Sequence, residues 1–207
     1  MLFFDESGDS TILFATTLPG ADKRFLKGGG SLATHTFLVV KDKNGKMTHF
    51  AYGSEINGLM GAFEGRLREV EYYDDLKVMK GNLKNHLKYK KAIEPPLKAN
   101  GKKMSVEEFD RKVINVARSF GNNPNIKYFM LPGNNPTQEN CNTSSSTIFH
   151  KAGVSNQQIK ALRAEIPGIV SGFGSYRPWT ASEQKAAIDE RNTIIYNFWS
   201  NWKGVVK

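Results

Sequence analysis

The sequence has a single cysteine and no long apolar run. Because Cys141 is the only cysteine among 207 residues, internal disulfides and zinc sites built from several cysteines are excluded. The longest apolar runs, residues 12–15 and 37–40, are too short to cross a bilayer. The first residues turn acidic at Asp5, without the basic start and apolar stretch of a secretion signal. We therefore expect no membrane span and no signal peptide.

Acidic residues are also scarce, with 20 Asp and Glu against 29 Lys and Arg, which gives a net charge of +9. Such a chain suits an anionic partner: nucleic acid, a membrane surface or a cell-wall polymer. The segment 77–103 contains nine lysines but only one acid, one aromatic residue and no arginine. Since single-stranded nucleic acid is bound by stacking on aromatic side chains, the composition of this segment does not favour nucleic acid as a partner. A solvated lysine-rich face explains the segment equally well.

Local patterns predict a mixed fold of strands and helices. The predicted strands span residues 11–18, 34–40, 46–52 and 126–131, and the predicted helices span residues 105–120, 141–153, 155–166 and 180–202. The strands at 34–40 and 46–52 flank an Asn-Gly turn and form a hairpin. We expect one α+β domain with an antiparallel sheet and helices packed against it.

Cys141 is the first candidate for chemistry, because it follows a polar loop and opens a predicted helix. The free N–H groups and the helix dipole at that position favour a negative charge. They favour the thiolate form of a cysteine, which is its nucleophilic form, and they can stabilise an oxyanion. The alternative is a small buried cysteine with a packing role only.

Histidines supply candidate bases for such a nucleophile. Of the four, His35 and His49 lie on the two strands of the predicted hairpin. Two-residue periodicity can place both on one face of the sheet, where one can act as a base and the other can orient it. The alternative is two polar residues at strand ends. His86 lies in the lysine-rich segment and His150 within the predicted Cys141 helix, so neither is favoured.

These two pieces of sequence resemble a known family. Asn140-Cys141-Asn142, followed by a helix that ends in Ala152-Gly153-Val154, resembles the nucleophile helix of the NlpC-type papain-like peptidoglycan amidases. The hairpin from His35 to His49 is similar to that family's histidine strand. The order of histidine before cysteine is similar to the circularly permuted branch of the fold.

The resemblance implies a permuted papain-like (NlpC-type) fold without a cofactor or metal. Cys141 would be the nucleophile, His35 the general base and acid, and His49 the residue that orients His35, with Glu55 as an alternative orienting residue. The substrate would be an amide bond in the stem peptides of peptidoglycan, cleaved through a thioester. Residues 1–207 would form a single catalytic domain, with a lysine-rich insertion or lid at about residues 58–103.

The expected absence of an export signal bears on delivery. An enzyme made in the cytoplasm without a signal must be released by lysis or injected by a secretion machine into the periplasm of a target cell. In the second case the protein is an antibacterial toxin, and we expect a cognate immunity protein and a component of the secretion machine as partners.

An acidic cluster near the start of the chain supports a different activity. Asp5, Glu6 and Asp9 follow apolar residues, and three carboxylates can bind Mg²⁺ for phosphoryl chemistry. The string Asp-Glu-Ser-Gly-Asp also resembles the opening of an uncharacterised family with a ribonuclease H-like fold. Possible further ligands are Glu183, Asp189 and Glu190. A metal-dependent nuclease and a non-enzymatic binder of an anionic polymer therefore stay open as alternatives.

Overall fold

The computed structural model of the chain describes residues 10–17, 34–54, 67–69, 88–120, 126–129, 138–168, 170, 172–175, 182, 185, 189 and 193. The elements of this part are strands β1 (Ser10–Thr17), β2 (Thr34–Lys41), β3 (Met47–Phe50), β4 (Tyr52–Ser54), β5 (Leu67–Glu69), β6 (Lys88–Ala92), β7 (Lys127–Tyr128) and β8 (Gln138–Glu139), and helices α2 (Val106–Phe120), α3 (Cys141–Ala152) and α4 (Asn156–Glu165). The expected mixed α+β class is confirmed.

The main sheet has four antiparallel strands in the order β3-β2-β1-β6. The predicted hairpin is confirmed, with Val39 of β2 opposite His49 of β3. Its turn closes because the Asp42 carboxylate accepts the backbone N–H groups of Asn44 and Lys46 at 2.9 Å each. Gly45 has φ of 77°, a conformation that glycine adopts without steric cost.

Strand β6 was not predicted, and it lies in the lysine-rich segment. It pairs with β1, with Leu13 opposite Lys91 and Ala15 opposite Tyr89. An edge strand with four polar or charged residues among five shows no apolar alternation, so its sequence carries no strand signal. Residues 88–92 of the predicted insertion are therefore part of the main sheet, whereas residues 58–66 and 70–87 lie outside the described residues.

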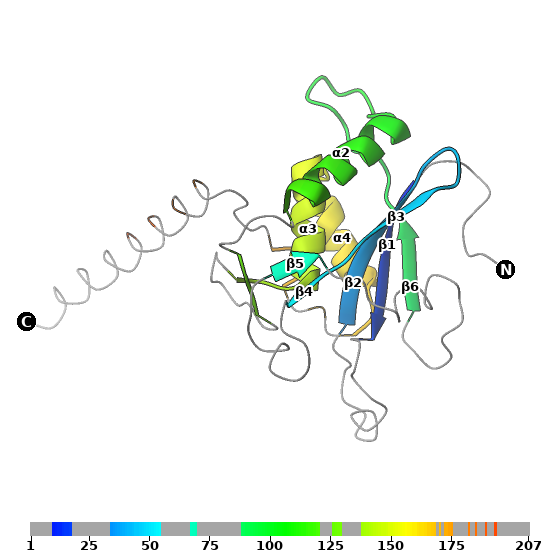
Figure 1. Ribbon diagram of the computed structural model, residues 1–207. Helices are drawn as coiled ribbons and strands as arrows, with labels where there is room; N and C mark the ends of the chain where they lie inside the picture. The colour runs from blue at the N-terminus through cyan, green and yellow to red at the C-terminus, as the bar shows by residue number, and fades with distance from the viewer. Residues whose placement is uncertain are drawn as a thin grey trace, which may run out of the picture.

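The three helices lie together on one side of the main sheet (Figure 1). The strand side chains of this face contact the buried side chains of the helices in one hydrophobic core, in which the larger members are Leu13, Leu38, Val40, Phe50, Phe109, Val113, Ile148, Phe149, Ile159 and Leu162. The side chains on the other face of the sheet, which alternate with these along β1 and β2, are buried as well. Which side of β2 a residue occupies therefore decides whether it can meet a helix.

The predicted helix boundaries are confirmed by their caps. Asn140 caps the start of α3 and Ser155 caps the start of α4, each with a reciprocal capping box. Gly153 ends α3 in the left-handed conformation, with φ of 104°. The four described residues of the predicted C-terminal helix are helical, and the rest of it lies outside the described residues. None of the described helices is both long and apolar enough to cross a bilayer.

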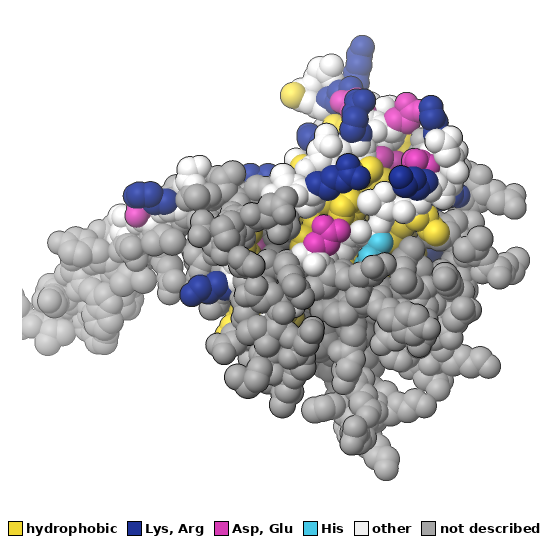
Figure 2. Space-filling model, in the orientation of Figure 1, with side chains coloured by type: hydrophobic (Ala, Val, Ile, Leu, Met, Phe, Trp, Pro, Cys, Tyr) yellow, Lys and Arg dark blue, Asp and Glu magenta, His cyan; other side chains and the backbone are white. Residues whose placement is uncertain are grey.

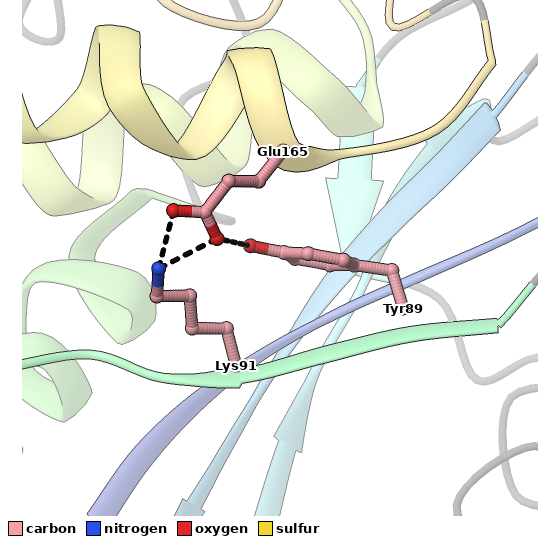
Figure 3. A network of polar contacts seen from close by, with 3 residues as sticks. All are labelled: Tyr89, Lys91 and Glu165. Carbon is pink, nitrogen blue, oxygen red and sulfur yellow. Dashed lines mark hydrogen bonds and ion pairs between the residues drawn. The ribbon is translucent and has the colours of Figure 1, made fainter.

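A polar network joins the end of α4 to strand β6 (Figure 3). The Glu165 carboxylate accepts a hydrogen bond from the Tyr89 hydroxyl at 3.0 Å and pairs with the Lys91 ammonium. These donors, Lys91 first and Tyr89 second, lower the pKa of Glu165, and burial together with Glu165 raises the pKa of Tyr89. Because the two side chains of the ion pair are 42% and 43% exposed, the pair adds little to stability.

The buried hydroxyl of Tyr52 predicts that the protein loses stability at alkaline pH. This hydroxyl donates to the Ala117 carbonyl at 2.7 Å, and burial, with Glu69 and Glu139 nearby, raises the pKa of Tyr52 well above 10.0. The unfolded chain therefore loses this proton first, so the free energy of unfolding should fall as pH rises above about 10. Tyr52→Phe should cost about 1 kcal/mol at pH 7. Urea titrations at several pH values should show that the free energy of unfolding of Tyr52→Phe falls less steeply above pH 10 than that of wild type. An equal fall with pH in both proteins would contradict the assignment.

Candidate functional site

Cys141 is the first residue of α3, as the sequence predicts. Asn140, in an extended conformation, accepts the N–H groups of Asn142 and Thr143 on its side-chain oxygen at 2.9 Å each. The Thr143 hydroxyl accepts the N–H of Asn140 in return at 2.7 Å. The capping box therefore occupies two of the first-turn N–H groups that were expected to stabilise an oxyanion, those of Asn142 and Thr143. The backbone N–H of Cys141 takes no part in it.

Helix α3 is buried almost completely, although its first half is polar. All residues from Cys141 to Phe149 are buried, including six consecutive side chains with amide or hydroxyl groups, residues 142–147. Two hydroxyls donate to carbonyls one turn earlier, Ser144 to Asn140 at 2.7 Å and Ser145 to Cys141 at 3.0 Å, and Ser146 donates to the distant carbonyl of Ser175 at 3.0 Å. Such bonds make burial of small polar side chains tolerable, so the helix can pass through the interior.

The start of α3 is bonded to β2 on both sides of His35. The single proton of the Thr36 hydroxyl is shared between two acceptors on α3, the Ser145 hydroxyl at 3.0 Å and the Cys141 carbonyl at 3.3 Å. The Asn142 side-chain amide donates to the Thr34 carbonyl at 2.9 Å. Among the described strands, β3 pairs with β2 only from Leu38 to Lys41, so α3 begins beside the part of β2 that β3 leaves open. The backbones of His35 and Cys141 are thus brought together.

The imidazole of His35 lies on the other side of β2 from α3. Successive side chains of a strand point to opposite faces, and Thr36 faces α3. His35 stacks on Phe37, with ring centroids 5.8 Å apart, and Phe37 stacks on Phe14 at 5.1 Å. His35 is 1% exposed and Cys141 is 4% exposed. The fold therefore brings the backbones of the two residues close together but directs the imidazole away from the face that α3 covers.

His49 shares a face with His35 but does not lie next to it. Because His49 is opposite Val39, its Cα is about four residues, or roughly 13 Å, along the sheet from His35. The Phe37 ring lies between the two imidazoles, with its centroid 5.2 Å from that of His49. The expected orientation of His35 by His49 is therefore not supported, because the turn shifts the hairpin register by four residues from a direct pairing.

Other candidate residues fall outside this site or outside the described residues. Glu55, His86, Glu183, Glu190 and the cluster of Asp5, Glu6 and Asp9 are not among the described residues. Asp189 pairs with Lys185 one helical turn away. His150, near the end of α3, has a ring nitrogen 3.1 Å from the Asn156 side-chain oxygen. Within the described ranges, no three His, Cys, Asp or Glu side chains form a group suited to a metal ion.

Charges of both signs are mixed on the face that carries α2. Lys and Arg side chains stand among Asp and Glu side chains there (Figure 2). Two lysines pair with acids, Lys98 with Glu108 and Lys103 with Glu94. The described residues of this face therefore do not form a continuous basic surface, while Lys77, Lys80 and Lys84 of the lysine-rich segment lie outside the described residues.

Three residues that hold α3 against β2 were not predicted from the sequence: Thr34, Thr36 and Asn142. Each looks unremarkable in the sequence, since threonine is common in strands and asparagine is common near helix starts. Their partners lie more than a hundred residues away, so only the folded chain reveals their pairing. Comparisons of the chain with models of protein families, with curated proteins and with solved structures give no match.

Proposed function

We propose that the chain is a cysteine hydrolase in which Cys141 is the nucleophile and His35 is the general base and acid. One observation carries the proposal: a hydrogen bond from Asn142 to the Thr34 carbonyl and one from the Thr36 hydroxyl to α3 hold the start of the helix against the strand on both sides of His35. The proposal includes a permuted papain-like fold. Its support is an antiparallel sheet that packs against a buried helix with the cysteine as first residue.

The reaction begins when Cys141 Sγ attacks the carbonyl carbon of an amide and the thiol proton passes to His35. The oxyanion that forms accepts the N–H of Cys141, the first-turn donor outside the capping box. The C–N bond breaks as His35 returns the proton to the leaving amine, and the acyl group stays on Sγ as a thioester. Water, deprotonated by His35, then attacks the thioester; the C–S bond breaks and the thiol regains its proton.

The mechanism requires a conformational change when substrate binds. Cys141 and His35 are 4% and 1% exposed, so the substrate carbonyl must gain access to the sulfur. The imidazole must also come within about 3.2 Å of Sγ or of a bridging water. Because the imidazole lies on the other side of β2 from α3, this contact requires residues 34–36 of β2 to move relative to the start of α3. Catalytic contacts that tighten only in the substrate complex are common in hydrolases.

The proposed substrate is an amide bond in peptidoglycan stem peptides. Its support is the similarity of residues 35–49 and 141–154 to the motifs of NlpC-type amidases, together with the net charge of +9. A positive chain is attracted to an anionic wall at low ionic strength. Digestion of purified sacculi followed by mass spectrometry of the released fragments tests the activity directly and identifies the bond.

The two hairpin histidines provide a matched pair of variants for this assay. His35→Gln should lower the rate of fragment release by about 10²–10⁴-fold, because it removes the base. His49→Gln should change the rate less than about threefold, since Phe37 separates it from His35. Thermal unfolding of both variants controls for folding. Equal rates for wild type and His35→Gln would rule out the proposed base.

A further inference from the structure

Asn142, the second residue of α3, links the candidate nucleophile to strand β2. Its side-chain nitrogen donates to the Thr34 carbonyl at 2.9 Å, and its side-chain oxygen accepts from the Cys141 thiol, with the two atoms 3.7 Å apart. Asn142 is 3% exposed. One amide group therefore contacts both the sulfur and the backbone next to His35.

The orientation of this amide is fixed by its partners. A carbonyl oxygen can only accept, so the atom of Asn142 that faces Thr34 must be the nitrogen. The oxygen then faces the sulfur and can only accept from it. Because the thiol donates in this direction, the hydrogen bond favours one rotamer of the Cys141 side chain among the staggered three.

We propose that Asn142 is a positioning residue, which sets the direction of the Cys141 thiol relative to β2. This inference rests on the proposed function for its catalytic consequence, but not for its effect on the thiol itself. A nucleophile displaced by about 1 Å can lose about 10²-fold in rate, so control of the sulfur position has a large effect. Neither Asn140 nor Thr36 can replace it, because they contact backbone atoms of the helix start.

Asn142→Ala tests the inference, with Asn142→Ser as a second variant in case the first folds poorly. Ser146→Ala is the matched control, since Ser146 is also buried on α3 and also bonds a distant carbonyl, at 3.0 Å, but lies one turn away from the sulfur. Because Cys141 is the only cysteine, the rate of alkylation by iodoacetamide reports this thiol alone.

The expected results separate a positioning role from a structural one. In Asn142→Ala, alkylation of Cys141 should be about tenfold faster, because the sulfur loses its hydrogen-bond acceptor and the side chain that shields it from the reagent. On sacculi, kcat should fall about 10²-fold while KM changes less than about threefold. Ser146→Ala should alkylate at the wild-type rate even if it unfolds at a lower temperature.

Two outcomes would overturn the inference. One is equal alkylation rates in wild type and in both Asn142 variants, which would show that the amide does not constrain the sulfur. The other is an equal rise in the Asn142 variants and in Ser146→Ala, which would indicate a general loosening of α3. If wild type releases nothing from sacculi, the proposed function fails, while the alkylation comparison still decides the role of Asn142.

Discussion

Replacing Cys141 with alanine should lower the release of peptidoglycan fragments by at least about 10³-fold, the size of effect typical of a lost nucleophile. The chain has no second thiol that could form the thioester. The measurement is the initial rate of fragment release from sacculi, followed by mass spectrometry, for wild type and variant at equal concentration. Prior treatment of wild type with iodoacetamide should have the same effect.

The control for this variant is a measurement of its thermal stability, because Cys141 is buried among polar neighbours and its replacement could affect folding. Removing one sulfur atom should cost only about 1 kcal/mol, so Cys141→Ala should remain folded in thermal unfolding. A chelator should leave the wild-type rate unchanged, since the proposed steps use no metal. If Cys141→Ala released fragments at the wild-type rate, the cysteine mechanism would be excluded, and the acidic cluster at Asp5, Glu6 and Asp9 would become the next candidate.

Replacing Phe109 with alanine should lower the free energy of unfolding by about 3–5 kcal/mol. Phe109 lies on α2 with none of its side chain exposed and belongs to the core between the sheet and the helices. Its truncation removes apolar contacts and leaves a cavity that the surrounding elements fill only in part. Chemical denaturation in urea gives the free energy, and the slope of the transition shows whether the variant still unfolds in one step.

Val106→Ala on the same helix is the matched control. Val106 is 38% exposed at the first turn of α2, so its truncation should change stability by less than about 0.5 kcal/mol. Alanine has a higher helix propensity than either valine or phenylalanine, so a loss of stability in either variant reports lost packing. Similar losses in both variants would contradict the assignment of Phe109, but not Val106, to the core. A loss confined to Phe109→Ala would confirm that α2 is held by packing.

Local features of the fold could be predicted because their causes are close in sequence. The hairpin turn depends on Asp42 and Gly45, which lie within the turn itself. The start of α3 depends on Asn140 and Thr143, three residues apart, and its end depends on Gly153. Side chains that satisfy backbone groups within four residues leave a recognisable pattern in the sequence.

Features that depend on distant partners could not be predicted in the same way. Strand β6 pairs with β1, and its Tyr89 and Lys91 find their partner in Glu165 of α4, so nothing in the segment itself signals a strand. The register of the hairpin separates His35 from His49, which the alternation of strand residues left undetermined. Alternation gives the face of a residue, whereas register decides which residue is its neighbour.

By itself, the sequence determined where the hairpin turns, where three helices begin, and that one thiol lies at a helix start, because these depend on short-range hydrogen bonds and on backbone preferences. The tertiary structure alone decided that α3 is buried against β2, that Asn142 contacts both the Cys141 thiol and Thr34, and that Phe37 separates the two histidines. The hydrogen bonds between β2 and α3 join segments far apart in the chain, and they form only when burial of apolar side chains brings the sheet and helices together. The place of Phe37 between the histidines depends on the register of the hairpin.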